Sequence, residues 1–284
     1  MYARINGVDL FFDVVGSGLS LEERSLEPKP VLFVLHGGPG ADHSSLRPWL
    51  DGLQDAVQIV YFDHRGTGRS GRADVSTYTM EQMADDVEAL RIHLGVEKPV
   101  VLGSSFGGMV ALQYAVRYPD SLSTLILSDT APSYDFYATS MERVADLANA
   151  EQLELLMARF SGTITLEQNM RWNEVVGPLY YRTFPPLAQL EAATARMAFG
   201  PEVAEHVMRY ELPSYDVRAQ LGIIHAPTLV LVGRHDWVTG PLQAEEIVKG
   251  IPHADLHIFE NSGHNPQEEE TDEYIDVVAR FIRS

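Results

Sequence analysis

The sequence predicts an α/β protein in which a mostly parallel central sheet carries helices on both faces. Short continuous apolar runs are typical of parallel strands that are buried on both sides. Five such runs lie at 31–35, 57–62, 100–102, 125–127 and 228–232. Apolar residues at helical spacing fill the stretches between them, at Met80–Leu94 and Met109–Tyr118. This alternation of strand and helix predicts one parallel sheet.

The N-terminal stretch follows a different pattern. Residues 1–15 alternate polar and apolar side chains around Asn6-Gly7, which predicts a β-hairpin. Residues 16–30 are polar and contain proline, so we expect a surface loop there. A last strand is expected at 255–259, near the C-terminus.

The middle of the chain carries no convincing strand pattern between 131 and 214. Helical segments are expected instead at 140–160, 166–176, 187–197 and 201–209, separated by glycine and proline. We therefore expect a core domain made of residues 1–130 and 215–284, interrupted by a helical insertion at 131–214.

Composition excludes several classes of partner and chemistry. The 284 residues have a formal net charge of −19, which argues against nucleic acid and anionic membrane surfaces. The sequence has no cysteine, so disulfides and thiolate catalysis are excluded. Clusters with metal-ligand spacing and a phosphate-binding glycine loop are absent, so we expect no metal and no cofactor. Without a signal peptide or a membrane span, a cytoplasmic protein, possibly a homo-oligomer, is expected.

The pentapeptide Gly103-Ser104-Ser105-Phe106-Gly107 directly follows a predicted strand and precedes a predicted helix. Flanking glycines allow the sharp reversal that holds a central serine exposed at the top of a sheet. This context predicts Ser105 as a nucleophile. The alternative is a glycine- and serine-rich connection without chemistry.

A serine hydroxyl needs a base, and the base needs an orienting carboxylate. Asp236 lies in the loop after the strand at 228–232, and His264 lies in the loop after the strand at 255–259. The chain order serine, aspartate, histidine is the one that the G-x-S-x-G class requires. Asp129, also just past a strand end, is the competing acid.

Acyl transfer also needs donors for the developing oxyanion. The backbone N–H of Phe106, after the nucleophile, is one candidate. The loop His36-Gly37-Gly38-Pro39-Gly40 follows the strand at 31–35, and its Gly38 N–H is the second candidate. His36 is expected to orient this loop, and residues 63–70 are expected to be scaffold.

At these motifs the chain resembles the α/β-hydrolase superfamily over nearly its whole length. The sequences at 36–40, 103–108, 233–239 and 262–266 are similar to those of its proline iminopeptidase branch. The resemblance implies an α/β-hydrolase fold with Ser105 as nucleophile, His264 as general base and then acid, and Asp236 as its orienter. It also implies that residues 131–214 form a helical cap over the pocket.

The resemblance further implies where a substrate binds. Glutamates of the cap bind the substrate's free α-amine in that branch, and Glu211 is the matching position. Some relatives place a second such glutamate directly after the catalytic aspartate, where this chain has Trp237. We expect Glu211 and Trp237 at the substrate-binding site. The apolar cap pocket is expected to draw on Phe136, Tyr137, Trp172 and Phe184.

Three functions follow from this reading. The preferred one is a serine aminopeptidase that releases an N-terminal proline or small apolar residue from short peptides without a cofactor. An esterase or amidase for small apolar acyl groups is the alternative in the same class. A non-catalytic small-molecule receptor on the same fold is the alternative from another class.

Overall fold

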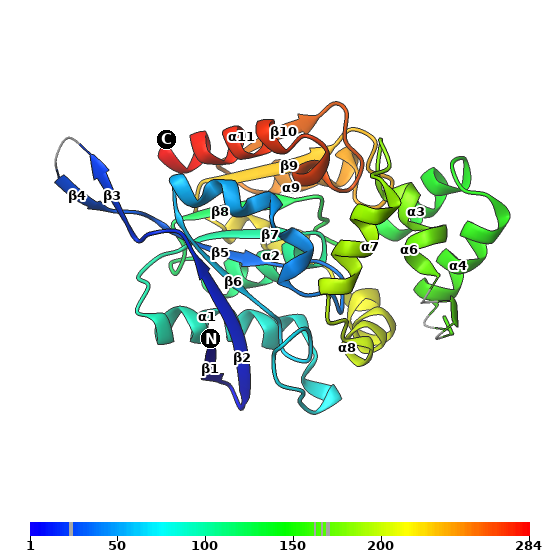
Figure 1. Ribbon diagram of the computed structural model, residues 1–284, viewed down its shortest axis with the longest axis horizontal. Helices are drawn as coiled ribbons and strands as arrows, with labels where there is room; N and C mark the ends of the chain where they lie inside the picture. Colours follow the sequence, from blue (N-terminus) through cyan, green and yellow to red (C-terminus); the bar gives the residue numbers. More distant parts are fainter. Residues whose placement is uncertain (23–24, 162, 166, 169–170) are drawn as a thin grey trace.

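A mostly parallel eight-stranded sheet forms the centre of the protein (Figure 1). The computed structural model describes residues 1–22, 25–161, 163–165, 167–168 and 171–284. The strand order is β1-β2-β6-β5-β7-β8-β9-β10. β1 and β2 pair antiparallel, as do β2 and β6, and every pair from β6 to β10 is parallel. The predicted fold class is confirmed.

The strands of this sheet lie close to the predicted runs. Their bounds are β1 Tyr2–Ile5, β2 Val8–Val15, β5 Val31–Leu35, β6 Gln58–Phe62, β7 Val100–Ser104, β8 Thr124–Ser128, β9 Thr228–Gly233 and β10 Ala254–Phe259.

The longer helices alternate with the strands in the core and follow one another in the middle of the chain. Their bounds are α1 Met80–Leu94, α2 Phe106–Arg117, α3 Phe136–Ala145, α4 Ala150–Phe160, α6 Trp172–Val175, α7 Leu187–Arg196, α8 Pro201–His206, α9 Pro241–Gly250, α10 Pro266–Glu269 and α11 Thr271–Arg283. A π-helical turn follows α8 at Val207–Glu211. Short 3-10 helices lie at His43–Leu46, Trp49–Asp55, Val75–Thr77, Gly177–Tyr180, Leu212–Ser214 and Arg218–Ile223.

The two faces of the sheet bury two separate apolar clusters, because side chains alternate along each strand. Phe33 and Leu35 of β5 belong to the cluster that α1, α2 and α9 cover. Leu32 and Val34 of the same strand belong to the cluster covered by α11 and the 3-10 helix Trp49–Asp55. Helices therefore lie on both faces, as predicted, and the central strands are almost fully buried.

The N-terminal hairpin is confirmed, but the loop expected at 16–30 is not a loop throughout. Ile5 pairs with Val8 across Asn6-Gly7, and both turn residues have positive φ, 45° and 85°. Beyond it, β3 (Leu19–Glu22) and β4 (Ser25–Pro28) form a separate two-stranded sheet that projects from the body of the molecule (Figure 1). The short alternating sequence Leu-Ser-Leu-Glu forms β3, although polar residues and prolines surround it.

The helical insertion lies at one end of the sheet, where α3, α4, α6, α7 and α8 gather (Figure 1). Among the described residues from 131 to 214 no strand occurs, and one isolated bridge pairs Ser133 with Asp216. The helix expected at 140–160 is two helices, α3 and α4. α4 begins with a capping box in which Asn149 and Gln152 bond each other's backbone N–H.

The remaining helices expected in this insertion are found close to their predicted positions. α7 lies within 187–197, and α8 with the π-helical turn covers 201–209. α6 lies within the segment expected at 166–176, where residues 166, 169 and 170 are outside the described residues. Among the described helices none is both long and apolar enough to cross a membrane.

Candidate active site

Ser105 sits in a sharp turn between β7 and α2, with φ 53° and ψ −120°. Positive φ is costly for a residue with a side chain, so the surrounding contacts must hold it there. Its N–H donates to Ser128 O at 2.9 Å, and its carbonyl accepts from Thr130 Oγ1 at 2.8 Å. Gly103 lies so close to Gly107 that a Cβ on it would collide with the Gly107 backbone. Because glycine has no Cβ, helix α2 can start directly at the end of the strand.

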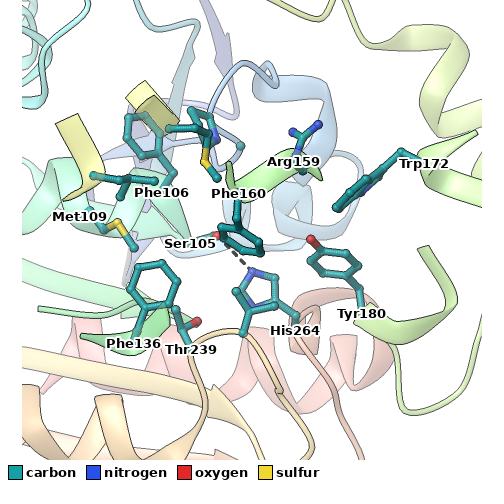
Figure 2. Close-up of a pocket in the computed structure, with 15 residues that line it drawn as sticks. Ser105, Phe106, Met109, Phe136, Arg159, Phe160, Trp172, Tyr180, Thr239 and His264 are labelled. Atoms are coloured by element: carbon teal, nitrogen blue, oxygen red, sulfur yellow. Dashed lines mark hydrogen bonds between the residues drawn. The ribbon is translucent and has the colours of Figure 1, made fainter. Parts of the chain in front are cut away.

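Three side chains from distant loops meet at this turn. His264 Nε2 lies 3.0 Å from Ser105 Oγ (Figure 2), and His264 Nδ1 lies 2.9 Å from Asp236 Oδ2. Asp236 follows β9, and His264 follows β10, which pairs with β9 in register. The carboxyl ends of parallel strands meet at one edge, so the two loops bring acid and base together.

The orientation of this pair is fixed by further hydrogen bonds. Asp236 Oδ1 accepts from Val238 N–H at 2.7 Å, and Asp236 Oδ2 accepts from Thr239 Oγ1 at 3.1 Å. The backbone N–H of His264 donates to Tyr180 O at 2.8 Å, which ties the histidine loop to the helical insertion. Asp236 and His264 are both buried.

Asp129, the competing acid, lies beside this pair but makes different bonds. It follows β8 with φ 47°, and its Oδ1 accepts from Gly233 N–H at 3.0 Å. Its Oδ2 accepts from Ser128 Oγ at 2.8 Å. The carboxylate that is hydrogen-bonded to His264 Nδ1 is therefore that of Asp236, while Asp129 holds the ends of β8 and β9 together.

The surroundings shift the pKa values of these groups in different directions. Burial alone would lower the pKa of His264, but the charge and hydrogen bond of Asp236 raise it above its ordinary value. Burial opposes ionisation of Asp236, yet His264 and the donated hydrogen bonds lower its pKa. Burial and the adjacent Asp236 raise the pKa of Asp129 well above its ordinary value. The pKa of the carboxyl group bonded to the histidine is thus lowered, and that of its neighbour is raised.

The glycine-rich loop after β5 lies against the serine. Gly38 and Phe106 both line the same cavity as Ser105. A Cβ on Gly37 would lie 3.2 Å from Ser105 Cβ, so this backbone approaches the serine closely. Gly38 has φ 131°, a conformation that glycine adopts readily. The two predicted oxyanion donors therefore belong to segments that flank the serine.

His36, which the sequence predicts to orient the loop after β5, forms its hydrogen bonds inside the core. Its Nδ1 lies 2.9 Å from Gly37 O, and its Nε2 accepts from His64 N–H at 3.1 Å. Residues 63–70 also act as scaffold, because Arg65 forms a buried ion pair with Asp86 of α1 through two contacts of 2.6 Å.

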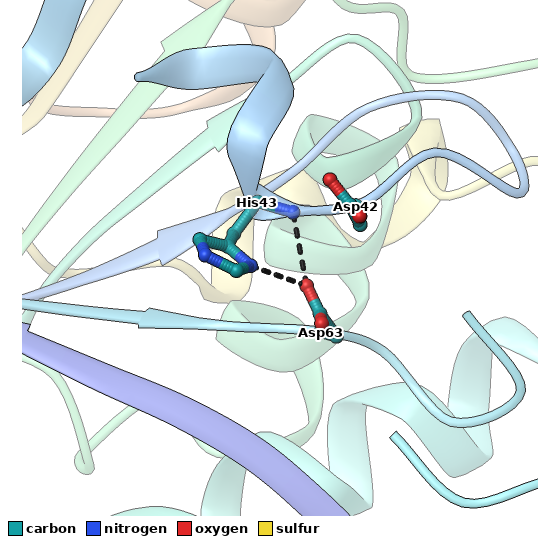
Figure 3. Close-up of side chains that lie close together, drawn as sticks. All are labelled: Asp42, His43 and Asp63. Carbon is teal, nitrogen blue, oxygen red and sulfur yellow. Dashed lines mark hydrogen bonds and ion pairs between the residues drawn. The ribbon is translucent and has the colours of Figure 1, made fainter. Parts of the chain in front are cut away.

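A second buried cluster, Asp42, His43 and Asp63, could offer ligand atoms to a cation but is already hydrogen-bonded (Figure 3). Asp63 Oδ1 lies 2.7 Å from His43 Nδ1 and accepts from His43 N–H at 3.0 Å. Asp42 Oδ2 accepts from Ala198 N–H at 2.8 Å. These bonds have a structural role, because they join the loops after β5 and β6 to the helical insertion.

A cavity opens beside Ser105 between the sheet and the helical insertion (Figure 2). Its volume is about 70 Å³, small against the roughly 300–1,000 Å³ of ordinary ligand pockets, which favours a small substrate. Its walls are mostly apolar and aromatic, with one cationic side chain. They consist of Gly38, Pro39, Ser105, Phe106, Met109, Phe136, Arg159, Phe160, Trp172, Tyr180, Met208, Leu212, Val238, Thr239 and His264.

The substrate-binding residues expected from the resemblance do not line this cavity. Glu211 ends the π-helical turn and is not among the lining residues, and burial together with the nearby charge of Glu81 raises its pKa. Trp237 is 1% exposed and packs edge-on against Tyr180, with ring centroids 5.4 Å apart. Trp237 thus packs on a lining residue and does not itself line the cavity.

The aromatic lining was predicted in part. Phe136 and Trp172 line the cavity, whereas Tyr137 and Phe184 do not. Tyr137 packs on Tyr134 and Phe160, and Phe184 packs on Tyr181. Sequence reasoning missed Arg159 and Tyr180. An arginine in the last turn of an amphipathic helix looks like an ordinary solvent-facing residue, so no sequence signal marked it.

Comparison with known proteins gives one consistent family. Residues 30–271 match the profile of the α/β hydrolase fold. The chain is 32% identical to proline iminopeptidase PfmaB of Pestalotiopsis fici, over 100% of this chain and 98% of that protein. A proline iminopeptidase structure from Mycobacterium smegmatis superposes with a TM-score of 0.78 at 24% identity, covering 100% and 97%. A thermophilic esterase from Thermogutta terrifontis gives 0.75 at 26% identity, with the same coverage.

Proposed function

Because the chain belongs to the α/β-hydrolase family, we propose that it is a serine hydrolase that works through an acyl-enzyme, with Ser105 as its nucleophile. The observation that carries this proposal is the continuous chain of hydrogen bonds from Ser105 Oγ through His264 to Asp236. Each of the three side chains comes from a different strand end, and this arrangement serves nucleophilic catalysis.

The reaction proceeds in two halves. Ser105 Oγ attacks the substrate carbonyl carbon while His264 Nε2 takes the hydroxyl proton, and Asp236 stabilises the resulting imidazolium. The backbone N–H groups of Gly38 and Phe106 receive the developing oxyanion. His264 then gives its proton to the leaving atom as the bond to the carbonyl carbon breaks. Water attacks the acyl-enzyme by the same route, and Ser105 is regenerated.

The cavity favours an esterase or amidase for small apolar acyl groups. Among the described residues no aspartate or glutamate lines it, and its one cation is Arg159. A protonated α-amine would lose its hydration there without gaining a carboxylate partner, and Arg159 would repel it. Neutral acyl esters and amides avoid this cost.

An aminopeptidase is the second candidate, and similarity favours it. The chain is 32% identical over its full length to a protein named as a proline iminopeptidase. Under this reading, the amine would have to enter neutral or be held by aromatic rings of the cavity.

The experiment compares 4-nitrophenyl esters of small fatty acids with the 4-nitroanilides of proline and alanine, using the wild-type enzyme and Ser105→Ala. We expect ester turnover that falls by about 10³-fold or more in Ser105→Ala. Ser123→Ala, at an exposed serine before β8, is the matched control and should keep wild-type activity.

Four outcomes decide among the candidates. Ester turnover without anilide turnover excludes the aminopeptidase. Turnover of the proline anilide shows that the enzyme is not restricted to substrates with neutral acyl groups. Activity that survives unchanged in Ser105→Ala refutes the nucleophile. No turnover of any of these substrates would instead support the non-catalytic receptor.

A further inference from the structure

The histidine loop, residues 260–265 between β10 and α10, lies directly against the helical insertion. The N–H of His264 donates to Tyr180 O at 2.8 Å, and the centroids of the two rings are 5.6 Å apart (Figure 2). A Cβ on Gly263 would lie 2.5 Å from the same carbonyl oxygen and 3.0 Å from Tyr181 Cα. The two segments therefore touch through their backbones, and a shift of one displaces the other.

Three consecutive glutamates follow the histidine loop, and two of them hold one of these segments each. Glu268 accepts from the insertion, with Tyr181 Oη at 3.1 Å and Gln189 Nε2 at 3.0 Å. Glu270 accepts from the histidine loop, with Ser262 Oγ at 2.6 Å. These two side chains each fasten one segment to the start of the C-terminal helices.

The glutamate between them, Glu269, bridges the two segments. Its Oε2 accepts from Gly263 N–H at 2.6 Å, and its Oε1 accepts from Thr183 N–H at 2.8 Å. Hydrogen bonds to an ionised carboxylate are stronger than those between neutral groups. Both donors belong to the main chain, so the bridge fixes backbone positions in both segments. One of them is the residue directly before His264.

The position of His264 leaves little room for movement. Its ring lies 3.0 Å from Ser105 Oγ and 2.9 Å from Asp236 Oδ2. A misplacement of about 1 Å at a reacting group can cost about 100-fold in rate. The segment that Glu269 holds on the other side carries Tyr180, which lines the cavity. The bridge thus connects the base to a wall of the cavity.

We propose that Glu269 is a positioning residue that fixes the histidine loop to the insertion, so that His264 and the cavity wall at Tyr180 are placed together. Glu269 is not among the residues that line the cavity, and it acts through the main chain beside His264. This inference rests on the proposed function, since it takes His264 as the general base.

Steady-state kinetics of Glu269→Gln tests the role on a 4-nitrophenyl ester. The amide keeps the size of the side chain but has one oxygen, so one of the two backbone donors loses its acceptor. We expect kcat to fall about tenfold to hundredfold, while KM changes less than about threefold. Glu269→Asp keeps both acceptors and should retain a larger share of kcat.

Two further glutamates serve as comparisons. Glu273→Gln is the matched control, because Glu273 is an exposed residue of α11 that pairs with His257, and it should keep the wild-type kcat. Glu268→Gln leaves the bridge intact and should change kcat by less than about threefold. An unchanged kcat in Glu269→Gln, or an equal loss in Glu268→Gln, overturns the proposal.

Hydrogen exchange separates failure of the bridge from failure of the proposed function, because it needs no turnover. Deuterium uptake is measured by mass spectrometry on peptides that contain Thr183 and His264. Both peptides should exchange faster in Glu269→Gln, and the Thr183 peptide alone in Glu268→Gln. This pattern supports the bridge even if the wild type hydrolyses no ester. Unchanged exchange of both peptides in Glu269→Gln overturns it. If Glu269→Gln does not fold, which circular dichroism detects, Glu269→Asp takes its place in both measurements.

Discussion

At the scale of single residues, the two acids beside His264 differ in what they can do. Asp236 is bonded to the imidazole and to backbone N–H groups, which lowers its pKa. Asp129 bonds to Gly233 and Ser128, and burial raises its pKa. Neighbouring carboxylates whose pKa values are pushed apart can take separate roles. Here Asp236 orients the base, and Asp129 joins two strands.

Asparagine substitutions at the two positions should therefore have unequal effects. Asp236→Asn should lower kcat by about 10⁴-fold, because the imidazole loses the partner that fixes its tautomer. Asp129→Asn should lower kcat by about tenfold or less, because an amide oxygen still accepts from Gly233. Steady-state kinetics on one ester checks both. Equal losses would mean that Asp129 shares the role of Asp236.

The raised pKa of His264 predicts the acid limb of the pH profile. The histidine must be neutral to accept the proton from Ser105, so kcat/KM falls as the pH drops through its pKa. Because Asp236 raises that pKa, the limb should lie above the ordinary histidine value of about 6.5.

Removing the carboxylate should reverse this shift. In Asp236→Asn the pKa of His264 should move down, since burial then acts without the opposing charge. Proton titration of the ring by NMR in the wild type and the variant measures this directly. An acid limb below pH 6.5 in the wild type, or a higher pKa of His264 in the variant, would contradict the pairing of His264 with an ionised Asp236.

The sequence predicted the site residues unevenly, for physical reasons. Ser105, Asp236 and His264 were predictable because parallel strands end at one edge, so residues just after strands must meet. Glu211 came from the resemblance alone, and whether such a residue lines the cavity depends on packing between elements, which the sequence does not reveal. Whether Arg159 faces the cavity depends in the same way on how α4 is rotated about its axis.

At the scale of elements, the turn between β7 and α2 depends on close backbone approach. A Cβ on Gly107 would meet the carbonyl oxygens of Leu35 and His36 in β5 and the loop after it. These neighbours are backbone atoms, which cannot move aside without displacing the strand. The packing of α2 on β5 thus holds Ser105 beside the loop that contains Gly38.

Gly107→Ala should destabilise the protein by about 1–3 kcal/mol or more and reduce kcat. Gly222→Ala is the control, because nothing lies within 4 Å of a Cβ added there, and it should change stability by less than about 0.5 kcal/mol. Thermal unfolding of both variants beside the wild type measures the difference. Equal melting temperatures would refute the close approach.

Elements of the core were easier to predict than those of the insertion. Strands β5 to β9 are continuous apolar runs buried on both faces, so their limits are visible in the sequence. The break between α3 and α4 depends on a capping box, a local signal at Asn149 and Gln152 that apolar periodicity does not reveal. β3 and β4 are short strands in a polar stretch, and they resemble a loop for that reason.

At the scale of the whole molecule, backbone hydrogen bonds and a buried ion pair join segments that are distant in sequence. Gly200 N–H donates to Gly40 O at 2.7 Å, and Gly68 N–H donates to Ala198 O at 3.1 Å. The insertion is therefore fixed to the loops after β5 and β6. The buried pair of Arg65 and Asp86 fixes the second of these loops to α1.

Arg65→Met should cost about 3–5 kcal/mol of unfolding free energy, because it leaves Asp86 buried without its partner. Arg4→Met removes an exposed pair with Asp9 and should cost about 1 kcal/mol or less. Urea denaturation of the two variants provides the comparison. Similar small losses would show that the buried pair does not anchor the loop.

Hydrolysis by this protein depends on an acyl-enzyme at Ser105. The most direct measurement is acid quenching during turnover of a 4-nitrophenyl ester, followed by peptide mapping by mass spectrometry. We expect a mass increase equal to the acyl group on the peptide that contains Ser105, and none in Ser105→Ala. Turnover in the wild type with no acyl group on Ser105, or equal turnover in Ser105→Ala, would contradict a covalent mechanism at this serine.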